Sequence, residues 1–255
     1  KIQTHPTRYY GLPNGAAKAY FVCQKYLNNG QNALFVTSCE TDDFDSAARE
    51  FAPRGAQTFT LPDTDTGRMN ALYDLLSPAS GSRLLSAHYE ALSLPLPDPE
   101  EFKKRLFTVH RGDTLRRQEL LDRLEAAGYT RDDYAEVPGQ YAARGSVVDI
   151  FCLNRPEPLR LYFAGNRIDV ISAFDLDTQN TKEHADEAVI IPLAFENTPA
   201  SLADYVQNYS FIFDEPDKEF NPADYPGCAV TTLLPAAEGV NCNLKANIAF
   251  NANMD

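Results

Sequence analysis

The chain has 255 residues, of which 36 are acidic and 23 are basic, and its formal net charge is -13. This charge opposes sequence-independent binding to the phosphate backbone of nucleic acids. No apolar run approaches the roughly 18 residues that a membrane span needs, and the first residues lack the pattern of a signal peptide. We therefore expect a cytoplasmic protein, without membrane contact, that folds as one large domain or two smaller ones.

The cysteines are odd in number and widely spaced, and no C-x-x-C pair suggests zinc or redox chemistry. This pattern favours reduced and mostly buried thiols, because a free cysteine usually packs as a small hydrophobic side chain. The five positions are Cys23, Cys39, Cys152, Cys228 and Cys242.

The first hundred residues alternate helix-like and strand-like segments, which is typical of a parallel α/β layer. Helices are predicted over residues 16–27, 42–51 and 69–76, and strands over residues 33–37, 58–61 and 83–86. A proline-rich piece at 94–99 then interrupts regular structure, and a helix around residues 100–106 leads into a second region.

Residues 12–19 lie where a phosphate-binding loop is expected in such a fold, between the first strand and the first helix. When Lys18 is aligned with the loop lysine, Leu12 and Ala17 replace the two required glycines. Ala19 replaces the hydroxyl residue that holds magnesium. Three of the four required positions therefore fail, and we expect no nucleotide, metal or other cofactor in this chain.

A second motor-like feature is the pair Asp214-Glu215, which follows a predicted buried strand at 211–213. It resembles the acidic pair that positions magnesium in ATP-driven motors. Because the loop at 12–19 is broken, we interpret this pair as an acidic turn at a strand end.

The periodicity changes from residue 107 onwards. Leu120, Leu121 and Leu124 form one apolar stripe of a predicted helix that Thr114 can cap. Gly128 stands where a left-handed cap should end that helix.

A mostly antiparallel sheet is predicted after this helix. Pro138-Gly139 fits the centre of a type II turn, where a strand should reverse, and the following strand should leave Arg144 exposed at its end. Gly145 allows a bulge or bend before the apolar run 147–151. Further strands are predicted at 159–163 and 167–174.

Several motifs in this region resemble domain 2 of the UvrB and Mfd family of bacterial nucleotide excision repair. They are G-Y-T-R at 128–131, V-P-G-Q-Y-A-A-R-G-S-V-V-D-I-F at 137–151, P-L-R-L-Y-F at 158–163, G-N-R-I-D at 165–169 and F-D-L-D-T-Q-N-T at 174–181. The resemblance covers residues 107–194 at motif level and extends more loosely over both flanks. In that family this domain binds UvrA.

The resemblance also implies an architecture. It consists of a degenerate, motor-like parallel α/β domain into which a small, mostly antiparallel α+β domain is inserted. Domain 1a would span residues 1–106, domain 2 residues 107–194, and domain 1b residues 195–255, where the chain returns to complete the first domain. The broken loop and the short connection at 62–67, in place of the long aromatic-rich insertion of UvrB, indicate the N-terminal region of an Mfd-type transcription-repair coupling factor.

Three arginines are implied as UvrA-binding residues. Arg131 and Arg144 match contact positions of the family, and Arg160 matches the arginine of the following strand. A planar guanidinium suits this role because it pairs with carboxylates through two parallel hydrogen bonds. Ala142 stands where UvrB has another arginine, and Tyr162 stands where the family usually has an acidic residue.

The predicted function is recruitment of UvrA to stalled RNA polymerase, without enzymatic activity in these residues. An ATP- and magnesium-dependent motor, together with the contacts to DNA and RNA polymerase, would belong to other parts of the full-length protein. Two alternatives stay open at this point. One is a UvrB-like, ATP-dependent subunit that handles DNA damage, and the other is a stand-alone adaptor for a different partner.

Overall fold

The computed structural model of the chain describes residues 6–216, 225, 227–232 and 239–242. The described residues divide into two compact units. The first unit draws on Lys1–Leu61, Ser77–Leu94 and Leu202–Asp255, and the second on Pro62–Leu76 and Pro95–Ser201. The second unit thus takes in a helical segment, 62–76, that lies within the predicted domain 1a, and the boundaries at 106/107 and 194/195 stay predictions.

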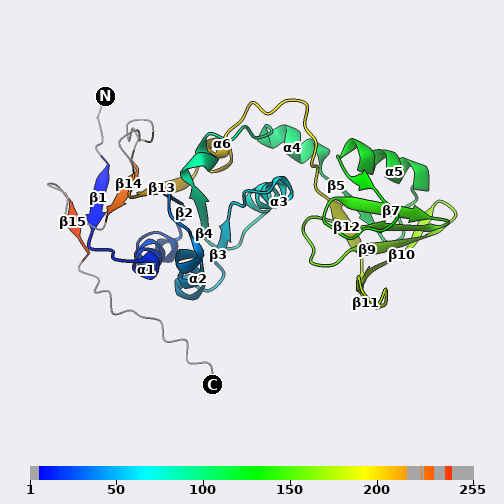
Figure 1. Cartoon of the computed structure of the whole chain (residues 1–255), viewed down its shortest axis with the longest axis horizontal. Coiled ribbons are helices and arrows are strands. Elements are labelled where there is room, and N and C mark those ends of the chain that lie inside the picture. The colour runs from blue at the N-terminus through cyan, green and yellow to red at the C-terminus, as the bar shows by residue number, and fades with distance from the viewer. Residues whose placement is uncertain (1–5, 217–224, 226, 233–238, 243–255) are drawn as a thin grey trace, which may run out of the picture. The chain divides into compact units, whose positions relative to one another are not determined.

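The first unit contains a parallel seven-stranded sheet in the order β15-β1-β14-β13-β2-β4-β3 (Figure 1). Its strands in chain order are β1 (Thr7–Tyr10), β2 (Asn32–Thr37), β3 (Gln57–Thr60), β4 (Arg83–His88), β13 (Tyr209–Asp214), β14 (Ala229–Thr232) and β15 (Val240–Asn241). Because β13 lies between β2 and β14, the chain returns to this sheet after the second unit, as predicted. The sequence towards Met254 is Asn-rich and favours turns, but residues 243–255 lie outside the described residues.

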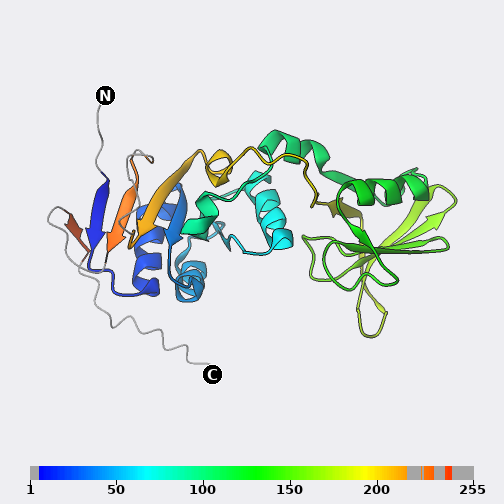
Figure 2. The same cartoon turned by 45° about the horizontal axis from the view of Figure 1, so that its top comes forward.

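Two helices, α1 (Gly15–Lys25) and α2 (Asp42–Phe51), lie side by side on one face of this sheet (Figures 1 and 2). Their apolar side chains share one core cluster with side chains of β2, β4 and β13, and Phe35 stacks on Phe44 with ring centroids 3.9 Å apart. The unit also contains α6 (Leu202–Tyr205) and the short 3-10 helices η1 (Leu27–Asn29) and η2 (Tyr89–Leu92). The predicted parallel α/β class is confirmed.

The second unit is built on a six-stranded sheet in the order β11-β10-β9-β8-β7-β6. The strands are β6 (Thr130–Arg131), β7 (Gln140–Arg144), β8 (Val147–Ile150), β9 (Leu159–Ala164), β10 (Arg167–Phe174) and β11 (Thr181–Ala185). All neighbouring pairs are antiparallel except β6 and β7. A separate antiparallel pair joins β5 (Phe107–His110) to β12 (Glu187–Ile190). The predicted, mostly antiparallel α+β class is therefore also confirmed.

The helices of the second unit are α3 (Asp65–Leu76), α4 (Pro99–Arg105) and α5 (Arg117–Ala126). Figures 1 and 2 show α5 along one side of the six-stranded sheet, and its predicted stripe of Leu120, Leu121 and Leu124 is buried. Gly128 ends this helix at φ +90°, where the Tyr129 N–H donates to the carbonyl of Leu124 at 2.9 Å. The predicted left-handed cap is correct.

Thr114 does not cap α5, so that prediction was wrong. The helix begins three residues later, at Arg117, and its N-cap residue Arg116 makes no side-chain capping hydrogen bond. Thr114 instead forms an antiparallel bridge with Arg167. The next residue joins the same segment, because the Leu115 N–H donates to the carbonyl of Asn166 at 2.7 Å. Pairing with the sheet thus delays the start of the helix.

The turn at Pro138-Gly139 forms as predicted, with Gly139 at φ +90° and the Gln140 N–H donating to the carbonyl of Val137 at 3.1 Å. It does not reverse a strand, however, because residues 132–137 are irregular and β6 runs parallel to β7. Of the two alternatives predicted for Gly145, a bulge or a bend, the structure has the bend. Arg144 pairs directly with Val147, so Gly145, at φ +56°, opens a two-residue hairpin turn in place of a bulge.

Candidate partner-binding face

One face of the second sheet carries a row of side chains that cross-strand pairing places next to each other. Ala142 on β7 pairs with Asp149 on β8, Asp149 pairs with Arg160 on β9, and Arg160 pairs with Ser172 on β10. Paired residues share a face of the sheet, so these side chains lie in one line across four strands. Small residues stand at both ends of the row, and Arg160 supplies its one guanidinium group.

Asp149 is the centre of this row. Its side chain is only 3% exposed, yet it accepts hydrogen bonds from two arginines. Arg160 donates through Nε to Oδ1 at 2.7 Å and through Nη2 to Oδ2 at 2.9 Å, while Arg144 donates through Nη2 to Oδ2 at 3.1 Å. The buried carboxylate is therefore fully paired, and the three groups together carry one net positive charge.

The guanidinium of Arg160 is fixed by several further contacts. Its guanidinium lies 4.1 Å from the centre of the Phe174 ring, and Nη2 also donates to Oε1 of Gln179 at 2.9 Å. The hydrogen bonds to Asp149 raise the pKa of Arg160 above its ordinary value. With 15% of its side chain exposed, Arg160 is a fixed part of the sheet surface.

Arg144 is held more loosely, at the exposed end of β7 that the sequence predicts. Half of its side chain is exposed, and its guanidinium lies 4.9 Å from the ring centre of Tyr134. Tyr134 is itself 52% exposed. The two side chains form an accessible pair of a planar cation and an aromatic ring, the residue types that are enriched in the energetic centres of protein interfaces.

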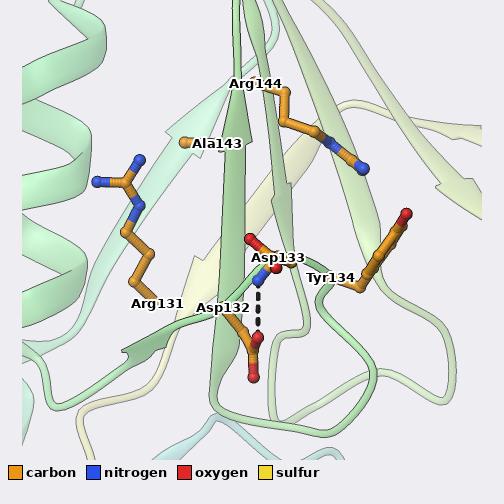
Figure 3. A pocket seen from close by; sticks show the side chains of 6 residues that line it. All are labelled: Arg131, Asp132, Asp133, Tyr134, Ala143 and Arg144. Atoms are coloured by element: carbon orange, nitrogen blue, oxygen red, sulfur yellow. Dashed lines mark hydrogen bonds between the residues drawn. The ribbon is translucent and has the colours of Figure 1, made fainter.

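A pocket of about 260 Å³ adjoins this pair. The residues that line it are Arg131, Asp132, Asp133, Tyr134, Ala143 and Arg144. Figure 3 shows the side chains of Arg131 and Arg144 on opposite sides of the strand that bears Ala143. Among these residues, the backbone N–H of Asp133 donates to Oδ1 of Asp132 at 2.7 Å (Figure 3).

Arg131 is therefore separated from the Asp149 row. It pairs with Tyr141, whose hydroxyl donates to Oε1 of Glu125 on α5 at 2.6 Å, so Arg131 lies on the α5 side of the sheet. The structure brings Arg144 and Arg160 together through Asp149 and places Arg131 next to Arg144 only along the rim of the pocket. Tyr162, 39% exposed, follows Arg160 by two positions on the same strand face.

We call the group of Tyr134, Arg144, Asp149, Arg160 and Tyr162 the arginine face. Sequence reasoning assigned no role to Tyr134 or Asp149. The sequence did contain one signal for Asp149, which is a charged residue between apolar neighbours in β8. A charge buried in such a run needs a partner of opposite charge. Identifying its partners requires the strand register, which the sequence alone does not supply.

In the first unit, the lysine of the broken loop at 12–19 forms an ion pair with the strand-end acid. Nζ of Lys18, on α1, lies 2.8 Å from Oδ1 and 2.9 Å from Oδ2 of Asp214 at the end of β13. Asp214, 3% exposed, also accepts hydrogen bonds from Oγ1 of Thr37 at 3.1 Å and Oγ1 of Thr231 at 2.8 Å. The motor-like lysine and the strand-end acid thus neutralise each other.

Other predicted features can be placed in the described part of the chain. All five cysteines are free, and burial raises the pKa of Cys23 to about 11 and that of Cys152 to about 12. Cys228 is buried too, whereas Cys39 is exposed, so the prediction of mostly buried thiols is confirmed. The described residues contain no group of three or more His, Cys, Asp or Glu side chains that could hold a metal ion. None of the described helices is long and apolar enough to span a membrane.

Comparison with known proteins bears on the second unit above all. Residues 107–194 match the family described as the UvrB interaction domain. The transcription-repair-coupling factor of Haemophilus influenzae is 32% identical over 127 residues, which are 50% of this chain and 11% of that protein. The corresponding factor of Escherichia coli is 28% identical over 130 residues, 51% of this chain and 11% of that protein.

UvrABC system protein B of Thermus thermophilus is similar as well, with 31% identity over 112 residues, which are 44% of this chain and 17% of that protein. The chain thus matches a small part of the length of each of these relatives. Residues 107–194 thus resemble the UvrB interaction domain, within a chain that is similar to transcription-repair-coupling factors and UvrB proteins over about half of its length.

Proposed function

We propose that this chain is the N-terminal, UvrB-like module of a transcription-repair coupling factor and that it recruits UvrA to stalled RNA polymerase. The observation that carries the proposal is the arginine face, because it lies inside the matched interaction domain and presents a guanidinium and an aromatic ring to a partner. Arg131, Arg144 and Arg160 are the proposed UvrA-binding residues.

The proposal also assigns no ATPase activity and no cofactor to these residues. The pairing of Lys18 with Asp214 supports this assignment, because both side chains already neutralise each other where a motor would hold phosphate and magnesium. The ATP-driven motor, and the contacts with RNA polymerase and DNA, would belong to other parts of the full-length protein. A cytoplasmic location agrees with five free cysteines.

The test is calorimetric titration of the purified chain with UvrA from its own organism. Saturable binding is expected for the unmodified chain. The double substitution Arg131→Ala, Arg144→Ala should weaken it by about 2–5 kcal/mol if these charges are buried at the interface. Arg111→Ala is a matched control, because Arg111 is a 60% exposed arginine of the second unit that pairs with Asp186. Failure of the unmodified chain to bind would refute the recruitment role and favour an adaptor for another partner.

The similarity to UvrABC system protein B favours a second candidate, a UvrB-like subunit that uses ATP while handling damaged DNA. A nucleotide held by the native state alone raises the unfolding temperature. Thermal unfolding with saturating ATP and magnesium therefore separates the two candidates. Unchanged unfolding temperature is expected for the coupling-factor module, and clear protection would support the UvrB-like subunit.

A further inference from the structure

We propose that Asp149 is a positioning residue of the arginine face, which holds Arg144, beside the ring of Tyr134, ready for a single carboxylate of the partner. This inference rests on the proposed function, because the partner is taken to be UvrA. It assigns different tasks to two of the three predicted arginines. Arg144 contacts the partner, whereas Arg160 serves as a fixed support.

The first step concerns Arg160. Its Nε and Nη2 atoms both donate to Asp149, and Nη2 also donates to Gln179, while Phe174 covers one face of the guanidinium. A partner could engage this group fully only by displacing bonds to a buried carboxylate, which would leave Asp149 uncompensated. Arg160 therefore acts mainly by keeping Asp149 in place.

The second step concerns Arg144. A guanidinium carries five N–H donors, and the structure describes one hydrogen bond from this side chain, through Nη2 to Asp149. With half of the side chain exposed, donors remain for a second carboxylate. Asp149 fixes one edge of the group and Tyr134 fixes one of its faces, so the orientation of the remaining donors is set before the partner arrives.

The third step is the charge of the site. Arg144 and Arg160 exceed Asp149 by one positive charge, although the whole chain is strongly acidic. One carboxylate of the partner would neutralise that excess. Asp132 and Asp133 line the adjoining pocket together with Arg131, which they outnumber, so they oppose a second acidic group at the same place. The site thus fits one carboxylate whose apolar stem rests on the exposed ring of Tyr134.

A double-mutant cycle tests whether Asp149 acts through Arg144. UvrA binding is titrated for the unmodified chain, Asp149→Asn, Arg144→Ala and the double variant at one fixed salt concentration. We expect Arg144→Ala to weaken binding at least about 30-fold and Asp149→Asn about 5- to 20-fold. In the Arg144→Ala background, Asp149→Asn should cause no further loss, because the side chain that it positions is absent.

Equal losses from Asp149→Asn in both backgrounds would overturn the positioning role while leaving the recruitment function intact. If the unmodified chain does not bind UvrA, the recruitment function fails and this inference fails with it. The two failures are therefore distinguishable.

Because Asp149 is buried, Asp149→Asn could fold poorly, and Tyr134 supplies a second cycle at an exposed position. Tyr134→Phe keeps the ring and should bind like the unmodified chain. Tyr134→Leu removes the ring and should weaken binding, but only while Arg144 is present. A loss from Tyr134→Leu that persists in the Arg144→Ala background would contradict the proposed orientation of Arg144 by the ring.

Discussion

Arg160 donates hydrogen bonds to both carboxylate oxygens of Asp149, at 2.7 and 2.9 Å, and so compensates a charge that is 3% exposed. Removal of one partner from a buried ion pair costs about 3–5 kcal/mol, because the other charge stays buried. We expect a loss approaching this size for Arg160→Ala in the free energy of unfolding, measured by urea titration followed by circular dichroism, because Arg144 then supplies only one hydrogen bond to Asp149.

Arg144→Ala is the matched comparison, since Arg144 meets the same carboxylate but is half exposed. We expect a smaller loss, of about 0.2–1 kcal/mol, because water already solvates the exposed half of Arg144 and Arg160 keeps Asp149 paired. Equal losses for both variants would contradict the division between a fixed and an accessible arginine.

A second prediction concerns Lys18 and Asp214 in the first unit. Lys18→Met keeps most of the aliphatic stem but leaves the buried Asp214 carboxylate with two hydroxyl partners, Thr37 and Thr231, and no counter-charge. We expect up to about 3–5 kcal/mol of lost stability, part of which Asp214→Asn should restore in the double variant, because both charges are then gone.

The control for this pair is Lys103→Met, because Lys103 pairs with Glu100 in an exposed arrangement. It should change the free energy of unfolding by less than about 1 kcal/mol. If Lys18→Met proves as mild as Lys103→Met, the Asp214 carboxylate is not buried in solution as described.

A third prediction compares alanine substitutions at two glycines that both have a left-handed backbone conformation. Gly128 has φ +90°, and a Cβ there would lie 2.8 Å from the backbone nitrogen of Ala194. Gly165 has φ +64° and no atom within 4 Å of such a Cβ. Gly165→Ala should therefore cost only the conformational penalty of about 1–2 kcal/mol, and Gly128→Ala clearly more. Thermal unfolding of both variants checks the order, and the reverse order would count against the packing described around Gly128.

A fourth prediction follows from burial and the hydrogen bond of Tyr141, which raise its pKa from 10.0 to about 12. A group whose pKa is raised on folding contributes stability that is complete below its unfolded pKa and is lost as the pH rises through the folded value. The stability advantage of the unmodified chain over Tyr141→Phe should therefore be constant below about pH 10 and shrink between about pH 10 and 12. Urea titrations of both proteins across this range test it, and a constant difference would exclude the shift.

The fold could be predicted from the sequence where local pattern and chain order decide it. The helix at 42–51 and the strand at 167–174 have the predicted bounds, because apolar periodicity and the flanking breakers fix both ends. Thr114 shows the limit of this reasoning. The sequence around Thr114 suits either a helix cap or a bridge to a strand. Only pairing with the distant residue Arg167 decides between these two roles.

The candidate site shows the same limit at the level of side chains. Arg144 and Arg160 could be singled out, and the exposed end position of Arg144 followed from the turn chemistry before it. Their shared contact with Asp149 depends on the register of three strands, and register is a property of the paired sheet as a whole. The position of Arg131 on the α5 side likewise follows from the parallel pairing of β6, which the sequence did not indicate.

The order of strands in the first sheet has a consequence for how the chain is made. β2 pairs with β13, so neighbours such as Phe35 and Ile212 are separated by the whole of the second unit. During synthesis the residues of the second unit emerge completely before β13 exists. We therefore expect the second unit to acquire its structure on the ribosome while the sheet of the first unit still lacks its central strand, so that the first unit completes its folding last.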